Sequence, residues 1–105
     1  MEPVQVNLEA YRGDSWTQSF NLKRDGLPYN LTGSTVASWA AFDGSHTVLP
    51  VTVIDAPGGR FSIGLPSTMK AGKYQYDVEV TDSGGLVTTW IRGILDVQQD
   101  VTNAV

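Results

Sequence analysis

The clearest hydrophobic pattern in the chain lies between residues 72 and 97. Tyr and Val alternate with polar residues over 73–80, which is the period of a half-buried β-strand. The Thr-Asp-Ser-Gly-Gly segment at 81–85 tolerates the positive φ angles of a tight turn, and a second alternating segment follows. We therefore predict a β-hairpin. One face of its second arm carries Val87, Thr89, Ile91, Gly93, Leu95 and Val97.

Shorter alternating segments before this hairpin predict five further strands, separated by Gly, Pro, Asp and Asn residues that favour turns. The phase of the third strand is ambiguous, because Trp39 lies on one side and Phe42 on the other. The fourth strand contains Pro50, which favours a sheet edge or a bulge. The five strands are expected at residues 3–8, 15–22, 35–42, 47–54 and 60–65.

This spacing predicts an all-β fold, an immunoglobulin-like β-sandwich of about seven antiparallel strands. One short helical turn is expected near 66–71, ended by Gly72. Tyr74, or second Tyr76, would form the tyrosine corner of such a sandwich, and Trp39 would be its core tryptophan. Residues 1–97 would form the β-sandwich domain and residues 98–105 a C-terminal tail.

Composition narrows the possible partners. The 105 residues suffice for one domain with its own core. The formal net charge of -4 argues against nucleic acid and anionic membranes as partners. There is no cysteine for a disulfide or a thiol nucleophile, and no apolar run long enough for a transmembrane helix. Residues 1–10 lack the pattern of a signal peptide.

No motif in the sequence favours catalysis. His46 is the single histidine and falls in a polar turn, so a Ser-His-Asp arrangement has no supporting pattern. Phosphate-binding and dinucleotide-binding loops are absent. The Asp residues fall mostly in turns, and a calcium ion at one loop end is an alternative without the usual ligand spacing. We therefore expect no enzyme, no cofactor, and no catalytic or metal-binding residues.

An apolar surface on the last strand is the best candidate for a binding site. If Ile91 and Leu95 face the core, then Trp90, Arg92 and Ile94 face outward, and Trp and Arg are enriched at interface hot spots. The alternative is a bulge at Gly93 that turns Trp90 into the core. The tail would dock on a neighbouring subunit. The expected interface residues are Trp90, Arg92, Ile94, Asp100 and Val101.

Several motifs taken together resemble small β-sandwich proteins of tailed bacteriophages. These proteins are collar, tail-fibre-attachment or baseplate components. The chain also resembles the N-terminal domain of phage baseplate upper proteins. The motifs follow in order as RGDSW (12–16), DGLP (25–28), LTG (31–33), AGKYQYDVEV (71–80), TDSGG (81–85), IRGILDV (91–97) and DVT (100–102). They span most of the chain.

The resemblance implies a non-enzymatic structural protein of the virion, assembled in the bacterial host cytoplasm. Its partners would be further copies of itself and other phage structural proteins at the tail, collar or baseplate, or on the head surface. The alternative is a carbohydrate- or cell-surface-binding module. In that case Trp90, Tyr29 or Trp39 would stack on a sugar while Asp and Asn side chains bind its hydroxyl groups.

Overall fold

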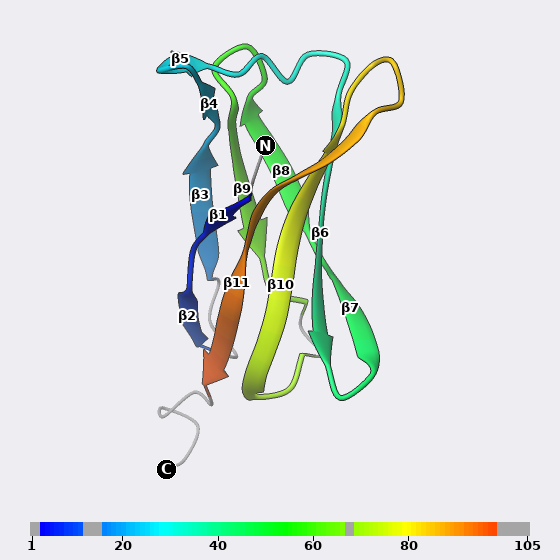
Figure 1. Cartoon of the computed structure of the whole chain (residues 1–105). Coiled ribbons are helices and arrows are strands. Elements are labelled where there is room, and N and C mark those ends of the chain that lie inside the picture. Colours follow the sequence, from blue (N-terminus) through cyan, green and yellow to red (C-terminus); the bar gives the residue numbers. More distant parts are fainter. Residues whose placement is uncertain (1–2, 12–15, 67–68, 99–105) are drawn as a thin grey trace.

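The computed structural model describes residues 3–11, 16–66 and 69–98, and these residues form an all-β structure without a helix (Figure 1). The strands are β1 (Val4–Gln5), β2 (Leu8–Tyr11), β3 (Thr17–Asn21), β4 (Lys23–Arg24), β5 (Leu27–Pro28), β6 (Thr35–Phe42), β7 (Ser45–Leu49), β8 (Val51–Asp55), β9 (Arg60–Gly64), β10 (Gly72–Thr81) and β11 (Val87–Gln98).

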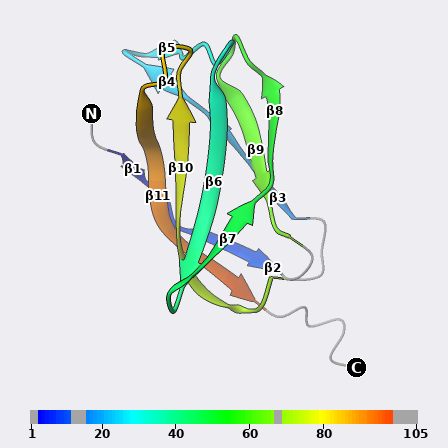
Figure 2. The ribbon, with the colours of Figure 1, turned by 90° about the vertical axis from the view of Figure 1, so that its right-hand side faces the viewer.

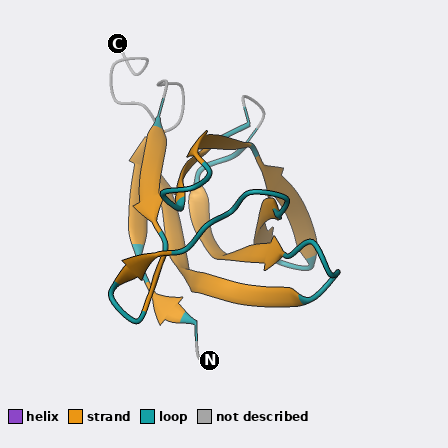
Figure 3. Cartoon of the chain, turned by 90° about the horizontal axis from the view of Figure 1, so that it is seen from above, coloured by secondary structure: helices purple, strands orange, loops and turns teal. Residues whose placement is uncertain are grey.

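The strands form two main sheets and a short hairpin. The large sheet has the order β1-β11-β10-β6-β7, and β2 also pairs with β11. The small sheet has the order β3-β9-β8, while β4 pairs with β5. Figure 2 shows the small sheet behind the large one, and Figure 3 shows the strands wrapping around a common interior. The two sheets therefore bury one face each against the other.

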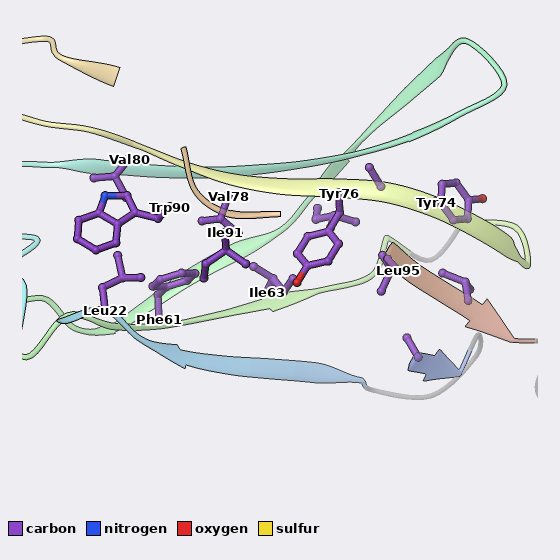
Figure 4. Close-up of a cluster of buried hydrophobic side chains, with 14 of the residues drawn as sticks. Leu22, Phe61, Ile63, Tyr74, Tyr76, Val78, Val80, Trp90, Ile91 and Leu95 are labelled. Atoms are coloured by element: carbon purple, nitrogen blue, oxygen red, sulfur yellow. The ribbon is translucent and has the colours of Figure 1, made fainter. Parts of the chain in front are cut away.

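The core lies between these two faces (Figure 4). Phe61 and Ile63 of β9 contribute from the small sheet, and both are fully buried. The large sheet contributes the residues that alternation placed on one face of β10, among them Tyr76 and Val78. Burying apolar surface of this kind contributes about 25 cal/mol per Å². The predicted inward face of β10 is thus confirmed.

The β10–β11 hairpin forms as predicted, but its register shifts at one residue. Val78 pairs with Ile91, whereas Glu79 pairs with Thr89, so Trp90 is the extra residue of a β-bulge. Trp90 and Ile91 consequently both face the core, and Trp90 is 4% exposed. The prediction that Trp90 points outward is wrong. The alternative of a bulge was right in kind, although the bulge lies at Trp90 and not at Gly93.

The hairpin β4–β5 covers Trp90 at one end of the core. The Tyr29 and Trp90 rings pack with centroids 4.8 Å apart. The guanidinium of Arg24 lies 5.0 Å from the Tyr29 centroid and 5.3 Å from that of Trp90, within cation–π range. Asp25 and Gly26 have positive φ, as the predicted tight reversal requires. The surroundings of Trp90 are therefore those of a packed core residue.

The predicted helical turn near 66–71 is not found. Residues 67–68 lie outside the described residues, and the rest of the segment forms no helix. Met69 instead donates one backbone hydrogen bond to Pro66 (3.1 Å) and buries its side chain in the core. The Tyr74 hydroxyl donates to the carbonyl of Lys70 (2.7 Å), which is the bond expected of a tyrosine corner. The buried Met69 side chain and the hydrogen bond from Tyr74 to Lys70, rather than a helix, fix the segment between β9 and β10.

The predicted fourth strand is two strands in different sheets. Pro50 separates β7 from β8, and the chain there crosses from the large sheet to the small one. Both strands lie at sheet edges, which agrees with the preference of proline for edge positions.

The predicted first strand is also divided. β1 and β2 both pair with β11 in parallel, and Val6 and Asn7 between them cross close to Gly93. Tyr76 donates its hydroxyl proton to the Val6 carbonyl (2.7 Å), and the Ile94 amide donates to Oδ1 of Asn7 (3.0 Å). A Cβ atom on Gly93 would lie 2.0 Å from the Val6 oxygen. Glycine is therefore required sterically at this position.

We expect Gly93→Ala to destabilise the fold by about 1–3 kcal/mol, because the added methyl group must displace the segment around Val6. Urea unfolding followed by circular dichroism would measure the change. Gly64→Ala is the matched strand control, since its Cβ would meet its nearest atom at 3.4 Å, an ordinary contact. Equal effects of the two substitutions would contradict the steric explanation.

Alkaline pH should weaken the contribution of Tyr76. Burial raises the pKa of Tyr76 to about 12 from an ordinary value of 10.0. The unfolded chain then ionises first, so the stability that the neutral phenol provides is complete below pH 10 and is lost as the pH rises toward 12. The advantage of the wild type over Tyr76→Phe should fall by about 1.4 kcal/mol between pH 8 and pH 11. A difference that stays constant in urea unfolding at both pH values would refute this.

Candidate functional site

The outer face of the large sheet, which points away from the small sheet, carries two rows of side chains that run across the strands. Register partners on neighbouring strands place their side chains on the same face. The first row consists of Gln5, Arg92, Asp77, Trp39 and Val48, from β1, β11, β10, β6 and β7. The second row consists of Ile94, Gln75, Ala41 and His46, from β11, β10, β6 and β7.

A groove of about 710 Å³ lies over these rows. Ala41 lines it and leaves space, because its side chain is small, and Gly93 contributes backbone to the floor. Its volume falls within the range of small-molecule sites in proteins, roughly 300–1,000 Å³. The groove is open to solvent, and half of its ten lining residues have polar side chains on this face, namely Gln5, His46, Gln75, Asp77 and Arg92. We define this groove, with its two rows, as the outer groove.

Asp77 is the unusual residue of the outer groove. Its Oδ1 atom is buried and has no hydrogen-bond partner, although Arg92 lies directly across the strand pair. Burial raises the pKa of Asp77, while the nearby charge of His46 acts to lower it. An unpaired buried acceptor costs about 1–3 kcal/mol. The fold therefore carries an unfavourable group at the centre of this face.

Trp39 lies beside Asp77, in register with it on β6. The prediction that Trp39 is the core tryptophan is wrong, because it is 37% exposed on the outer face. Its neighbour Ser38 points inward instead, is buried, and donates its hydroxyl to the Asp77 carbonyl (2.7 Å). The ambiguous phase of this strand is thereby resolved, and Trp90 fills the core position.

The predicted interface residues are thus separated by the fold. Arg92 and Ile94 are exposed and line the outer groove, while Trp90 is in the core. Asp100 and Val101 lie outside the described residues. His46 is on β7 and lines the groove as well.

Asp77 and Gln75 were not singled out from the sequence. The signal available for them was their place on the polar face of β10, which showed that they point outward. It did not show which strands flank β10, and the groove depends on those neighbours.

Neither a metal centre nor a membrane-spanning helix is found in the part of the chain that the structure describes. No group of three or more His, Cys, Asp or Glu side chains there is placed to hold a metal ion. No helix there is long and apolar enough to cross a membrane.

Comparisons with known proteins show a likeness of fold. No protein-family description and no curated protein sequence matches the chain. Among solved structures, the N-terminal domain of phage TP901-1 ORF48 is similar, with a TM-score of 0.63 and 15% identity over 92% of this chain and 90% of that chain. The Listeria monocytogenes internalin-like protein lmo2027 has a TM-score of 0.52 at 13% identity, over 93% of this chain and 28% of that protein. The all-β fold is thus shared by a phage domain of similar extent.

Replacing Asp77 by Asn should stabilise the protein at pH 7. Because burial raises the folded-state pKa above the ordinary value of 3.8, the ionised carboxylate is disfavoured in the folded chain. The wild type regains this stability as the pH falls toward that value, so the advantage of Asp77→Asn should shrink between pH 7 and pH 4. Urea unfolding of both proteins over this range tests the sign. An Asp77→Asn variant that is less stable at pH 7 would show that the carboxylate is well accommodated.

Proposed function

We propose that the chain is a non-enzymatic structural subunit of a tailed-phage particle, at the tail, collar or baseplate, that assembles through one side of its β-structure. We further propose that this structure is an immunoglobulin-like sandwich. The sheet orders β1-β11-β10-β6-β7 and β3-β9-β8, together with the bond from Tyr74 to Lys70, support that assignment.

The observation that carries the proposal is an uncharged segment at residues 48–54, which we call the edge segment. Its sequence is Val-Leu-Pro-Val-Thr-Val-Ile, and it supplies parts of the edge strands of both sheets, β7 and β8 (Figure 2). Neither strand has a second partner among the described residues. Edge strands usually carry charged residues that prevent pairing with other chains. The edge segment has none.

Exposed apolar side chains accompany this open edge. Val48 is 64% exposed and Ile54 is 50% exposed, and Val53 beside it is also exposed. A bulge between Val53 and Asp55 bends the end of β8, so regular pairing with a neighbour would use the earlier part of the strand. Backbone pairing combined with this apolar contact is a known mode of recognition between chains.

The likeness to the phage domain supports the assignment to a phage particle. It extends over nearly all of both chains. Together with an edge that carries no charged residue, it favours a subunit that functions through contacts with copies or neighbours. Arg92 and Ile94, predicted as contact residues, lie on a different face and are not needed for this assembly.

Light scattering after size exclusion, over a series of protein concentrations, tests the proposal. The wild-type chain should form assemblies heavier than its 11.4 kDa monomer. Ile54→Lys should weaken association about tenfold or more, because it places a charge among the exposed apolar side chains beside the open edge. Leu86→Lys is the control, since Leu86 is also an exposed apolar residue (67%, against 50% for Ile54) and lies at the β10–β11 turn.

Two results would contradict assembly through the edge segment. One is a wild-type chain that stays at 11.4 kDa at every concentration. The other is an Ile54→Lys variant that assembles as well as Leu86→Lys. Mass spectrometry of purified particles of the phage that encodes the chain tests whether the chain is a subunit of the particle. Many copies per particle are expected.

A further inference from the structure

The outer groove has the chemistry of a ligand site, and we propose that it binds a neutral saccharide. This inference concerns the outer face of the large sheet, not its edge, and does not depend on assembly. Val48 belongs to the first row and to the edge segment but does not line the groove. It rests on the row that places Arg92, Asp77 and Trp39 side by side across three strands.

The first argument is the unpaired oxygen of Asp77. Oδ1 is an acceptor that no group in the described chain satisfies. Oδ1 itself is buried, but the carboxylate lines the groove, where ligand hydroxyl groups can donate to it. Hydrogen bonds to a charged group are among the stronger ones in proteins. The same hydroxyl groups can also accept from Arg92, Gln75 and Gln5, which all line the groove.

The second argument is the balance of charge. A cation that approaches Asp77 also approaches the guanidinium of Arg92, which lies directly across the strand pair on β11. An anion that approaches Arg92 meets the carboxylate of Asp77 in the neighbouring strand. A neutral ligand avoids both repulsions, so this charge pattern selects against strongly charged ligands.

The third argument is the exposed face of Trp39. A large, rigid aromatic ring at the solvent boundary offers apolar area with little loss of conformational freedom. A sugar ring has an apolar C–H face and a rim of hydroxyl groups. Trp39 and Asp77 in register provide the matching pair of surfaces. A purely apolar ligand would leave Asp77 and Arg92 without partners, which is unfavourable.

The shape of the face argues against a second copy of the chain as occupant. Two copies that meet through a hollow face would enclose empty space, and voids lose the contacts on which close packing depends. A ligand that enters the groove fills it instead. The groove is large enough for a small oligosaccharide, being about 710 Å³.

Two-dimensional NMR of the full ¹⁵N-labelled chain can test this with maltotriose, cellotriose and N,N′,N″-triacetylchitotriose. Titration to about 10 mM detects dissociation constants in the millimolar range. We expect at least one trisaccharide to shift the Trp39 indole N–H signal and the backbone signals around Asp77 and Arg92. Arginine amide and sulfate, as charged probes, should cause no comparable shift.

Three variants locate the site. Trp39→Ala and Asp77→Asn should each weaken binding about tenfold or more. Glu79→Gln is the matched control, because Glu79 lies on the same strand and face as Asp77 but does not line the groove. It should bind as the wild type does. If Trp39→Ala does not fold, Asp77→Asn still tests the site, because Asn has the size of Asp. The same spectra show whether each variant is folded.

Two results would overturn the proposal. The first is the absence of groove shifts with all three trisaccharides at the highest concentration. The second is binding that Trp39→Ala and Asp77→Asn leave unchanged, or that arginine amide or sulfate reproduces. Failure here is distinguishable from failure of the assembly proposal, since Ile54→Lys should keep saccharide binding and Asp77→Asn should keep assembly.

Discussion

The bulge at Trp90 is the feature on which both the core and the outer face depend. In a regular strand, a Trp90 that faces the core would bring Arg92 and Ile94 inward with it, because side chains alternate with a period of two. One extra residue in β11 removes this conflict, since Val78 pairs with Ile91 while Glu79 pairs with Thr89. Trp90 then packs on Tyr29 at one end of the core. Arg92 is left free to join the row that contains Asp77 and Trp39.

This arrangement also shows where sequence reasoning succeeds and fails. Alternation is local, so it predicted the strands of the β10–β11 hairpin, the bounds of β6 and the inward face of β10. A bulge interrupts alternation without leaving a residue type that marks it. The roles of Trp39 and Trp90 were therefore exchanged: the phase of β6 was ambiguous, and the shift in β11 was placed at Gly93.

Other differences arise from contacts between distant residues. The sequence identifies Gly93 only as a glycine within a strand. Its steric role depends on Val6, which crosses beside it and accepts a hydrogen bond from Tyr76. Pro50 signalled an edge, but a sequence does not say that the chain changes sheets there. The outer groove needs the order of five strands, and only the fold brings Gln5, Asp77 and His46 to one face. In the sequence, the polar residues that line the groove are far apart and show no common motif.

The unpaired oxygen of Asp77 is informative because domains of this size are stable by about 5–15 kcal/mol, and one unsatisfied acceptor uses an appreciable part of that. A neutral residue in its place would relieve the penalty, so the carboxylate is not explained by stability. Breaches of local consistency of this kind concentrate at functional sites.

β7 connects the two proposed surfaces. It contributes His46 to the outer groove, and Val48 of the first row is also the first residue of the edge segment. A neighbouring chain that paired along the free edge of β7 would extend the large sheet by one strand. The added strand would lie beside His46 and lengthen the wall of the groove at that end. Assembly through the edge segment would therefore leave the groove open, because strand addition occurs in the plane of the sheet while the groove faces outward from it.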